Sequence, residues 1–202
     1  MTTEDGAPVL RSLCVYCGSN PGRRPEYVEA GRALARAAAA RGIDLIYGGA
    51  TVGVMGAVAD AALDAGGRVV GVIPQALVDK ELAHHALTEL VVTASMHERK
   101  AMMAERADAF VALPGGVGTL EEIFEMWTWA QLGFHRKPCG LLNVAGYYDG
   151  LVAFLDRTVE EGFVRPGHRE MLVVEPTPDA LFERFVAYRP PVVTKWVGRG
   201  ET

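Results

Sequence analysis

The sequence predicts a single-domain α/β fold, a Rossmann-like, doubly wound parallel sheet with helices on both faces. Short apolar runs alternate along the chain with longer segments of helical periodicity. The runs are apolar at successive positions, which is typical of parallel strands buried on both faces. Hydrophobic residues make up 50% of the 202 residues, enough for one domain to build a sizeable core.

The expected elements follow one another in order, and glycine or proline marks most of their ends. Strands are expected at residues 13–16, 43–47, 69–73, 90–92, 109–113, 140–142 and 172–174. Helices are expected at residues 25–41, 54–65, 96–107, 119–130, 148–161 and 178–188. Loops are expected at residues 75–87, with one helical turn, and at 162–169. The domain is expected to span residues 11–189, between tails at 1–10 and 190–202.

The composition argues against several classes of function. The net charge is −5 without a basic run, which argues against nucleic acid as a partner. No apolar stretch is long enough to span a membrane, and residues 1–8 are unlike a signal peptide. Three cysteines are too few for a disulfide framework, and Cys14 and Cys17 point to opposite faces of one strand. We therefore expect a cytoplasmic protein with no membrane partner.

Glycine-rich turns follow several of the expected strands. Ligands of doubly wound sheets bind outside the carboxyl ends of the strands, so these turns are expected to form one lip. The lip is expected to comprise Gly18, Ser19, Gly48, Gly49, Met96, Gly115 and Gly116. Glycine permits close approach of the backbone to a ligand. The histidines have no metal-ligand spacing with cysteine or carboxylate partners, so neither a metal nor a cofactor is expected.

Residues 113–122, Leu-Pro-Gly-Gly-Val-Gly-Thr-Leu-Glu-Glu, carry the strongest signal in the chain. A buried strand leads into the glycines, and Thr119 is expected to open a helix. Free N–H groups and the helix dipole at such a junction bind anions. The expected phosphate-binding residues are Gly115, Gly116, Gly118 and Thr119. Because the dinucleotide fingerprint after the first strand and the triphosphate-binding loop are both missing, a mononucleotide or sugar phosphate is expected.

Two interpretations of Glu122 remain open at this point. Thr119-x-x-Glu122 has the spacing of a capping box, in which threonine and glutamate cap the helix reciprocally. A carboxylate one turn into an anion-binding helix is also a candidate for catalysis. The same spacing recurs at Ser95-x-x-Glu98, where capping alone is favoured.

Arg99 and Lys100 are adjacent cations near the start of an expected helix. The helix dipole disfavours cations at this position by a few tenths of a kcal/mol, up to about 1 kcal/mol. Their presence indicates an anionic group nearby, and the alternative is that both are solvated surface charges.

Residues 95–100, Ser-Met-His-Glu-Arg-Lys, and residues 114–122 together resemble the Lonely Guy (LOG) family. The family comprises cytokinin riboside 5′-monophosphate phosphoribohydrolases, which are often labelled lysine decarboxylases. The resemblance covers most of the chain, including Lys137-Pro138 and Gly146-Tyr147-Tyr148. One departure is Ala50, where the family usually has a third glycine.

The resemblance implies a hydrolase that cleaves the N-glycosidic bond of an N6-modified AMP, or of AMP itself. The free base and ribose 5-phosphate would be the products. The family's catalytic pair would fall on Arg99 and Glu122. Its substrate contacts would fall on Glu81, Arg99, Lys100, Gly116, Val117, Gly118, Thr119, Leu120, Glu121, Glu122 and Thr128.

The resemblance also implies a homodimer with the site near its interface. The apolar helix with Trp127 and Trp129 and the tail with Trp196 agree with a covered surface, although the two helical tryptophans also suit packing within the chain.

Three alternatives remain open. A nucleotide sensor would use the glycine loops without hydrolysis, and a carrier of a phosphorylated cofactor, as in molybdenum-cofactor carriers of similar fold, would retain its ligand. Lysine decarboxylation is the weakest, because only Lys100 of Lys80, Lys100, Lys137 and Lys195 lies near the lip, without a partner for a pyridine nitrogen.

Overall fold

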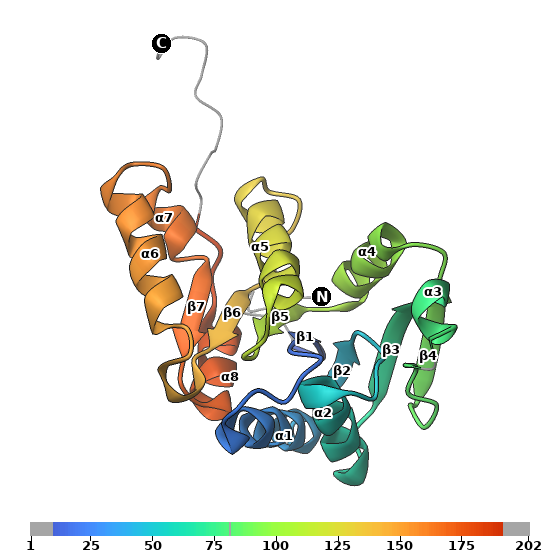
Figure 1. Cartoon of the computed structure of the whole chain (residues 1–202). Coiled ribbons are helices and arrows are strands. Elements are labelled where there is room, and N and C mark those ends of the chain that lie inside the picture. Colours follow the sequence, from blue (N-terminus) through green and yellow to red (C-terminus); the bar gives the residue numbers. More distant parts are fainter. Residues whose placement is uncertain (1–9, 81, 192–202) are drawn as a thin grey trace, which may run out of the picture.

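A seven-stranded parallel sheet forms the centre of the computed structural model, which describes residues 10–80 and 82–191 (Figure 1). The strands are β1 (Ser12–Tyr16), β2 (Asp44–Tyr47), β3 (Val69–Pro74), β4 (Glu89–Thr93), β5 (Ala109–Ala112), β6 (Cys139–Leu142) and β7 (Leu172–Glu175). Their order across the sheet is β4-β3-β2-β1-β5-β6-β7. The expected fold class and all seven strands are confirmed, with ends that differ by one or two residues.

Helices cover both faces of the sheet (Figure 1). They are α1 (Pro25–Ala40), α2 (Gly53–Asp64), α3 (Gln75–Val78), α4 (Met96–Arg106), α5 (Val117–Gln131), η1 (Val144–Gly146), α6 (Asp149–Glu160), α7 (Pro166–Arg169) and α8 (Pro178–Ala187). Helices α1, α2 and α8 lie on one face, and α4, α5, α6 and α7 lie on the other. Each face buries its own hydrophobic core. The loop expected at residues 162–169 contains α7, which begins at a proline suited to a first helical turn.

Side chains of β1 alternate between the two cores. Leu13, Val15 and Cys17 pack with α1 and α2, whereas Cys14 and Tyr16 pack with α4 and α5. The expectation that Cys14 and Cys17 point to opposite faces is confirmed. Both thiols are free and buried, and burial raises the pKa of Cys14 to about 12. These cysteines are core residues rather than a redox pair.

Strands that precede β5 in the chain and strands from β5 onward lie on opposite sides of β1 in the sheet. Strands β2, β3 and β4 extend the sheet from one side of β1, and β5, β6 and β7 extend it from the other. The loops after β1 and β5 therefore diverge to opposite faces and leave a crevice, which is where doubly wound folds bind ligands. The backbone N–H of Gly18 donates to the carbonyl of Pro114 at 3.2 Å and joins these two loops.

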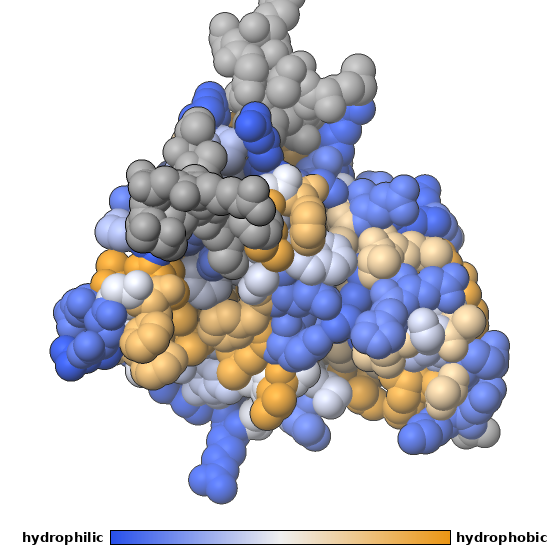
Figure 2. Space-filling model, turned by 90° about the horizontal axis from the view of Figure 1, so that it is seen from above, coloured by the Kyte–Doolittle hydropathy of each residue, from blue (hydrophilic) through white to orange (hydrophobic). Residues whose placement is uncertain are grey.

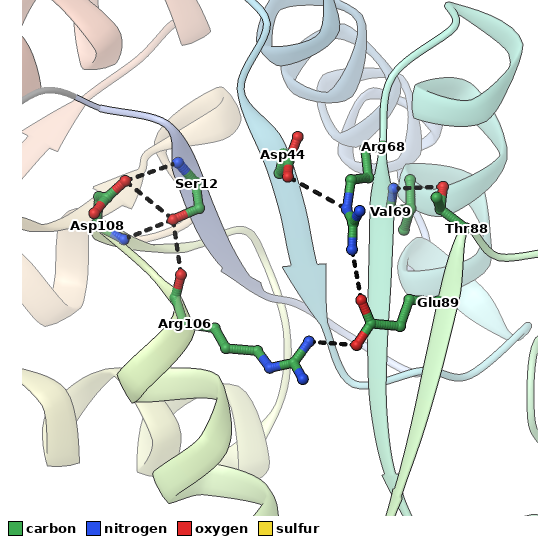
Figure 3. A network of polar contacts seen from close by, with 8 residues as sticks. All are labelled: Ser12, Asp44, Arg68, Val69, Thr88, Glu89, Arg106 and Asp108. Carbon is green, nitrogen blue, oxygen red and sulfur yellow. Dashed lines mark hydrogen bonds and ion pairs between the residues drawn. The ribbon is translucent and has the colours of Figure 1, made fainter.

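A polar network fastens the opposite, amino-terminal edge of the sheet (Figure 3). Oδ2 of Asp108 accepts hydrogen bonds from the backbone N–H and the hydroxyl of Ser12, at 3.0 and 3.1 Å. Glu89 accepts from Arg106 at 2.6 Å and from Arg68 at 2.5 Å. These bonds connect β1 with β5 and β3 with β4 far from the crevice, so the network is structural.

Among the residues that the structure describes, none of the helices has the length and apolarity needed to cross a bilayer. Most of the two expected tails, residues 1–9 and 192–202, lies outside the described residues, as does Trp196.

We expect Asp108→Ala to lower the free energy of unfolding by about 2 kcal/mol, because it removes the shared acceptor for Arg11 and Ser12. Urea unfolding measures the loss. Asp108→Asn keeps one side-chain oxygen and is expected to cost less. Equal stability of Asp108→Ala and the wild type would contradict the role given to this network.

Candidate active site

A cavity of about 680 Å³ opens at the carboxyl ends of the strands, across the crevice between β1 and β5. The loops after β1, β2, β3 and β5 and the starts of α4 and α5 line it. The lining includes the expected residues Gly18, Ser19, Gly48, Met96, Arg99, Gly115, Gly116, Val117, Gly118, Thr119, Glu121 and Glu122. Residues far apart in the sequence are thus brought to one edge. No group of metal-ligating side chains occurs within residues 10–80 and 82–191.

Four expected site residues lie outside the cavity lining. Gly49 turns away with φ +75°, and its carbonyl accepts from the backbone N–H of His84. Leu120 packs against the core under α5, and Lys100 points to carboxylates of α5. Thr128 is exposed on α5, about 14 Å along the helix from Thr119 at 1.5 Å per residue. A fifth expected residue, Glu81, lies outside the described residues.

Sequence reasoning missed several lining residues. They are Cys17, Asn20, Pro21, Gly22, Tyr27, Ala50, Val52, Met55, Leu77, Leu82, Pro114 and Tyr147. Most are apolar or aromatic and look like core residues in the sequence. Most of them lie just after a strand or at the start of the next helix, which is the signal that finds them; Leu82, in the loop after α3, is an exception.

The glycine loop leads into α5 differently from the expectation. Helix α5 begins at Val117, and Gly116 is its N-cap with φ −95° and ψ −156°. Within the described part of the chain, no side chain caps this helix. Of the two interpretations left open for Glu122, the capping box with Thr119 is therefore wrong, because Gly116 adopts the cap conformation and the helix starts earlier. The first N–H groups of α5 stay uncovered at the cavity, which is the arrangement that binds anions.

Close contacts fix the shape of the glycine loop. A Cβ atom on Gly115 would lie 2.1 Å from Oγ1 of Thr119 and 2.9 Å from the backbone N of Gly18, so only glycine fits there. The hydroxyls of Tyr147 and Tyr148 donate to the carbonyls of Gly115 and Leu113, at 2.5 and 2.6 Å. The loop is thus held in place before any ligand binds.

Arg99 and Glu122 form a buried ion pair in the wall of the cavity. Nη1 of Arg99 donates to Oε1 of Glu122 at 3.0 Å, and the two side chains are only 6% and 8% exposed. Nε of Arg99 also donates to the carbonyl of Val72 in β3 at 3.0 Å. A Cβ on Gly48 would lie 2.2 Å from Nη2 of Arg99, so this glycine makes room for the guanidinium.

The surroundings raise the pKa of Glu122 above its ordinary value. Burial is the main cause, and the charge of Glu121 adds to it. The charges of Arg99 and Lys100 oppose the rise without cancelling it. A carboxylate with a raised pKa in a cavity is a candidate for proton transfer.

Comparison with known proteins shows the family to which this chain belongs. A family model described as "Possible lysine decarboxylase" matches residues 55–185. A "Probable cytokinin riboside 5′-monophosphate phosphoribohydrolase" of Oryza sativa subsp. japonica is 51% identical, over 90% of this chain and 80% of its own. A cytokinin riboside 5′-monophosphate phosphoribohydrolase of Arabidopsis thaliana is 49% identical, over 90% of this chain and 84% of its own. The chain belongs to the Lonely Guy family.

Solved structures share the fold of this Lonely Guy protein at lower sequence identity. The molybdenum cofactor carrier protein of Chlamydomonas reinhardtii has a TM-score of 0.67 at 21% identity, covering 89% of this chain and 100% of its own. The molybdenum cofactor binding protein of Rippkaea orientalis has a TM-score of 0.66 at 22% identity, covering 87% of this chain and 94% of its own. At this identity the likeness establishes the fold alone.

Helix α4 of the Lonely Guy protein is capped by Ser95 and Glu98 as expected from the sequence, although the glutamate reaches Ala94, one residue before the N-cap. Oγ of Ser95 accepts from the N–H of Glu98 at 3.1 Å, and Glu98 accepts from the N–H of Ala94 at 2.7 Å. The expectation of anionic groups near Arg99 and Lys100 is also confirmed. The anions include Glu122 for Arg99, and Glu121 and Glu125 for Lys100.

Lys100 is unsuited to lysine decarboxylation. Its Nζ lies 2.5 Å from Glu121 and 3.1 Å from Glu125. The hydrogen bond to Glu121 raises its pKa despite burial, which keeps the amine protonated. A lysine that forms a Schiff base needs the opposite shift, toward a neutral amine.

We expect Gly48→Ala to lower the free energy of unfolding by about 1–3 kcal/mol, because its methyl group overlaps the guanidinium of Arg99. The guanidinium cannot move away without losing its hydrogen bond to Val72 or to Glu122. Urea unfolding measures this. Gly150→Ala is the control, since the added Cβ on α6 would have no described atom within 4 Å apart from its chain neighbours and its own helix backbone. The control is expected to gain about 0.5–1 kcal/mol. A stable Gly48→Ala would show that the guanidinium is not fixed.

Proposed function

We propose that this protein hydrolyses the N-glycosidic bond of an N6-modified AMP, releasing the free base and ribose 5-phosphate. The observation that carries the proposal is the buried Arg99–Glu122 pair beside an uncapped helix N-terminus in one cavity. The relatives of about 50% identity named as phosphoribohydrolases support it.

The 5′-phosphate binds where α5 begins. The N–H groups of Gly116, Val117, Gly118 and Thr119 belong to the unsatisfied first turn, and the helix dipole adds to their attraction for a phosphate. Gly115 brings the loop close to Gly18, which narrows the phosphate end of the cavity. The ribose then lies near Glu122.

Glu122 acts on the sugar. Departure of the base from C1′ builds an oxocarbenium-like charge on the ribose, which a nearby carboxylate stabilises. Oε1 of Glu122 accepts a hydrogen bond from Arg99, so we assign to Oε2 the role of binding the attacking water and accepting its proton. The C1′–N bond breaks, a C1′–O bond forms, the water proton passes to the carboxylate, and the base leaves with a proton from the medium or the site.

Arg99 positions this carboxylate. It holds Oε1 of Glu122 and is itself tied to Val72, so the charged pair moves little as the reaction proceeds. Glu121 lines the cavity, and Lys100 acts on the site through Glu121. Substrate contacts of Glu81, Leu120 and Thr128 rest on the family resemblance.

We further propose a cytoplasmic homodimer. Met96, Phe134 and Val92 are exposed apolar side chains on or near α4 and α5. Figure 2 looks onto the face covered by α4, α5, α6 and α7 and shows apolar patches among hydrophilic residues. A second copy packed on α5 would cover part of this surface and would approach Thr128. Three buried free cysteines suit a reducing compartment.

Glu122→Gln tests the catalytic role. We expect turnover to fall by about 10²-fold or more, because the amide neither stabilises positive charge nor accepts a proton. Nucleotide binding is expected to survive, since the phosphate site is unchanged. Chromatography of free base and ribose 5-phosphate after incubation with AMP or N6-isopentenyl-AMP measures turnover.

The matched control is Glu98→Gln, which keeps the capping box of α4 and lies outside the cavity lining. It is expected to retain wild-type turnover. Full activity of Glu122→Gln would remove Glu122 from the mechanism. Nucleotide binding without any release of base by the wild type would favour the sensor or carrier function instead.

The pH dependence of kcat/KM should report the ionisation of Glu122. The mechanism needs the carboxylate, so activity falls as the pH falls through its pKa. Because burial raises this pKa, the acidic limb should lie above pH 4.5, the ordinary glutamate value. Glu121→Gln removes a negative charge that raises the pKa, so it should move the limb to lower pH. A limb at or below 4.5, or one that Glu121→Gln leaves in place, would contradict the assignment.

A further inference from the structure

Two leucines on the β3 side of the cavity have no part in the chemistry described above. Leu77 on α3 and Leu82 both line the cavity and are partly buried. Among the described residues that pack the two hydrophobic cores, neither leucine occurs. Their side chains are therefore available to an apolar group of a ligand.

The backbone around Leu82 is attached to the loop that follows β2. The N–H of Thr51 donates to the carbonyl of Leu82 at 3.1 Å, and the N–H of His84 donates to Gly49 at 2.9 Å. An isolated antiparallel bridge joins Ala50 with residue 83 between them. These bonds hold one side of the segment that carries Leu82.

The side chain of His84 ties the same segment to helix α2. Its ring is buried, and Nε2 lies 2.9 Å from Oδ1 of Asp60. The backbone N–H of Ala86 donates to Nδ1 at 3.3 Å. Since a backbone N–H can only donate, Nδ1 is the acceptor and Nε2 carries the hydrogen that it donates to Asp60. We call this contact the His84–Asp60 clasp.

The position of the clasp relates it to one part of the substrate. The phosphate loop follows β5, and the strand order β5-β1-β2-β3 places Leu77, after β3, about 14 Å away at 4.8 Å per strand. A nucleotide with its phosphate at the loop and its ribose near Glu122 directs its base toward β2 and its N6 substituent toward β3. The N6 substituent is then the group that meets Leu77 and Leu82.

We propose that the His84–Asp60 clasp is a positioning device that holds Leu82 against the N6 substituent and thereby sets the preference for N6-alkylated AMP over AMP. The inference rests on the proposed hydrolase function, because the preference is a ratio of two hydrolysis efficiencies. Burial of an alkyl group stabilises the complex most when the wall is already ordered, since a mobile wall loses entropy on binding.

Asp60→Ala removes the acceptor of the clasp. The Asp60 side chain is 66% exposed, so the substitution leaves the core intact. We expect kcat/KM for N6-isopentenyl-AMP to fall by about 3- to 10-fold, mainly through KM, with a change below about 2-fold for AMP. Asp60→Asn keeps an oxygen acceptor for Nε2 of His84 and should restore the wild-type ratio. Melting temperatures of both variants check that the fold is unchanged.

Leu82→Ala removes part of the wall itself and is expected to lower the same ratio by about 10-fold or more. An unchanged ratio in Asp60→Ala or in Leu82→Ala overturns the proposal, as does an Asp60→Asn variant as impaired as Asp60→Ala. Failure of the wild type to release base from either nucleotide overturns the hydrolase function instead. The ratio of the dissociation constants of the two nucleotides, measured by calorimetry, then tests the clasp without turnover.

Discussion

The buried pair of Arg99 and Glu122 is the interaction on which the cavity depends. Removing two charges from water costs several kcal/mol per ion, so each side chain is stable in this position only because the other is present. The pair joins α4 to α5, and the bond to Val72 anchors both to the sheet. Gly48 must lack a side chain because the guanidinium occupies that space. The carboxylate of Glu122, to which we assign the catalytic role, is therefore positioned by the fold rather than by the substrate.

The position of β1 between β2 and β5 explains why this pair lies beside the proposed phosphate site. The loops after β1 and β5 begin side by side, because these strands are neighbours in the sheet. A hydrogen bond from the N–H of Gly18 to the carbonyl of Pro114 joins them. Helix α5 then leaves the sheet with its first N–H groups facing the crevice and Glu122 further along the same helix. One helix thus supplies both the anion-binding end and the carboxylate.

The fold and most of the lip could be predicted from the sequence, because buried parallel strands and glycine turns are local patterns. The two capping-box patterns show that the same local spacing can have different structural outcomes. Ser95 and Glu98 cap α4 as their spacing predicts, whereas the same spacing at Thr119 and Glu122 does not cap α5. The partner of Glu122 is Arg99, 23 residues earlier in the chain. Local spacing carries no information on such a long-range contact. For the same reason the sequence did not predict that Leu82 lines the cavity.

The glutamates that follow the first turn of α5 affect Glu122 and Lys100 in different ways. Burial is the main cause that raises the pKa of Glu122, and the charge of Arg99 opposes it. Glu121 adds to the rise through repulsion, and Lys100 lowers the pKa through attraction. Because Lys100 forms ion pairs with Glu121 and Glu125, those two carboxylates largely neutralise its charge. Because burial outweighs the attraction of both cations, Glu122 keeps a raised pKa although Arg99 and Lys100 lie nearby. The amine of Lys100, held protonated by the same contacts, suits electrostatic support of a hydrolase and not the Schiff base that a decarboxylase requires.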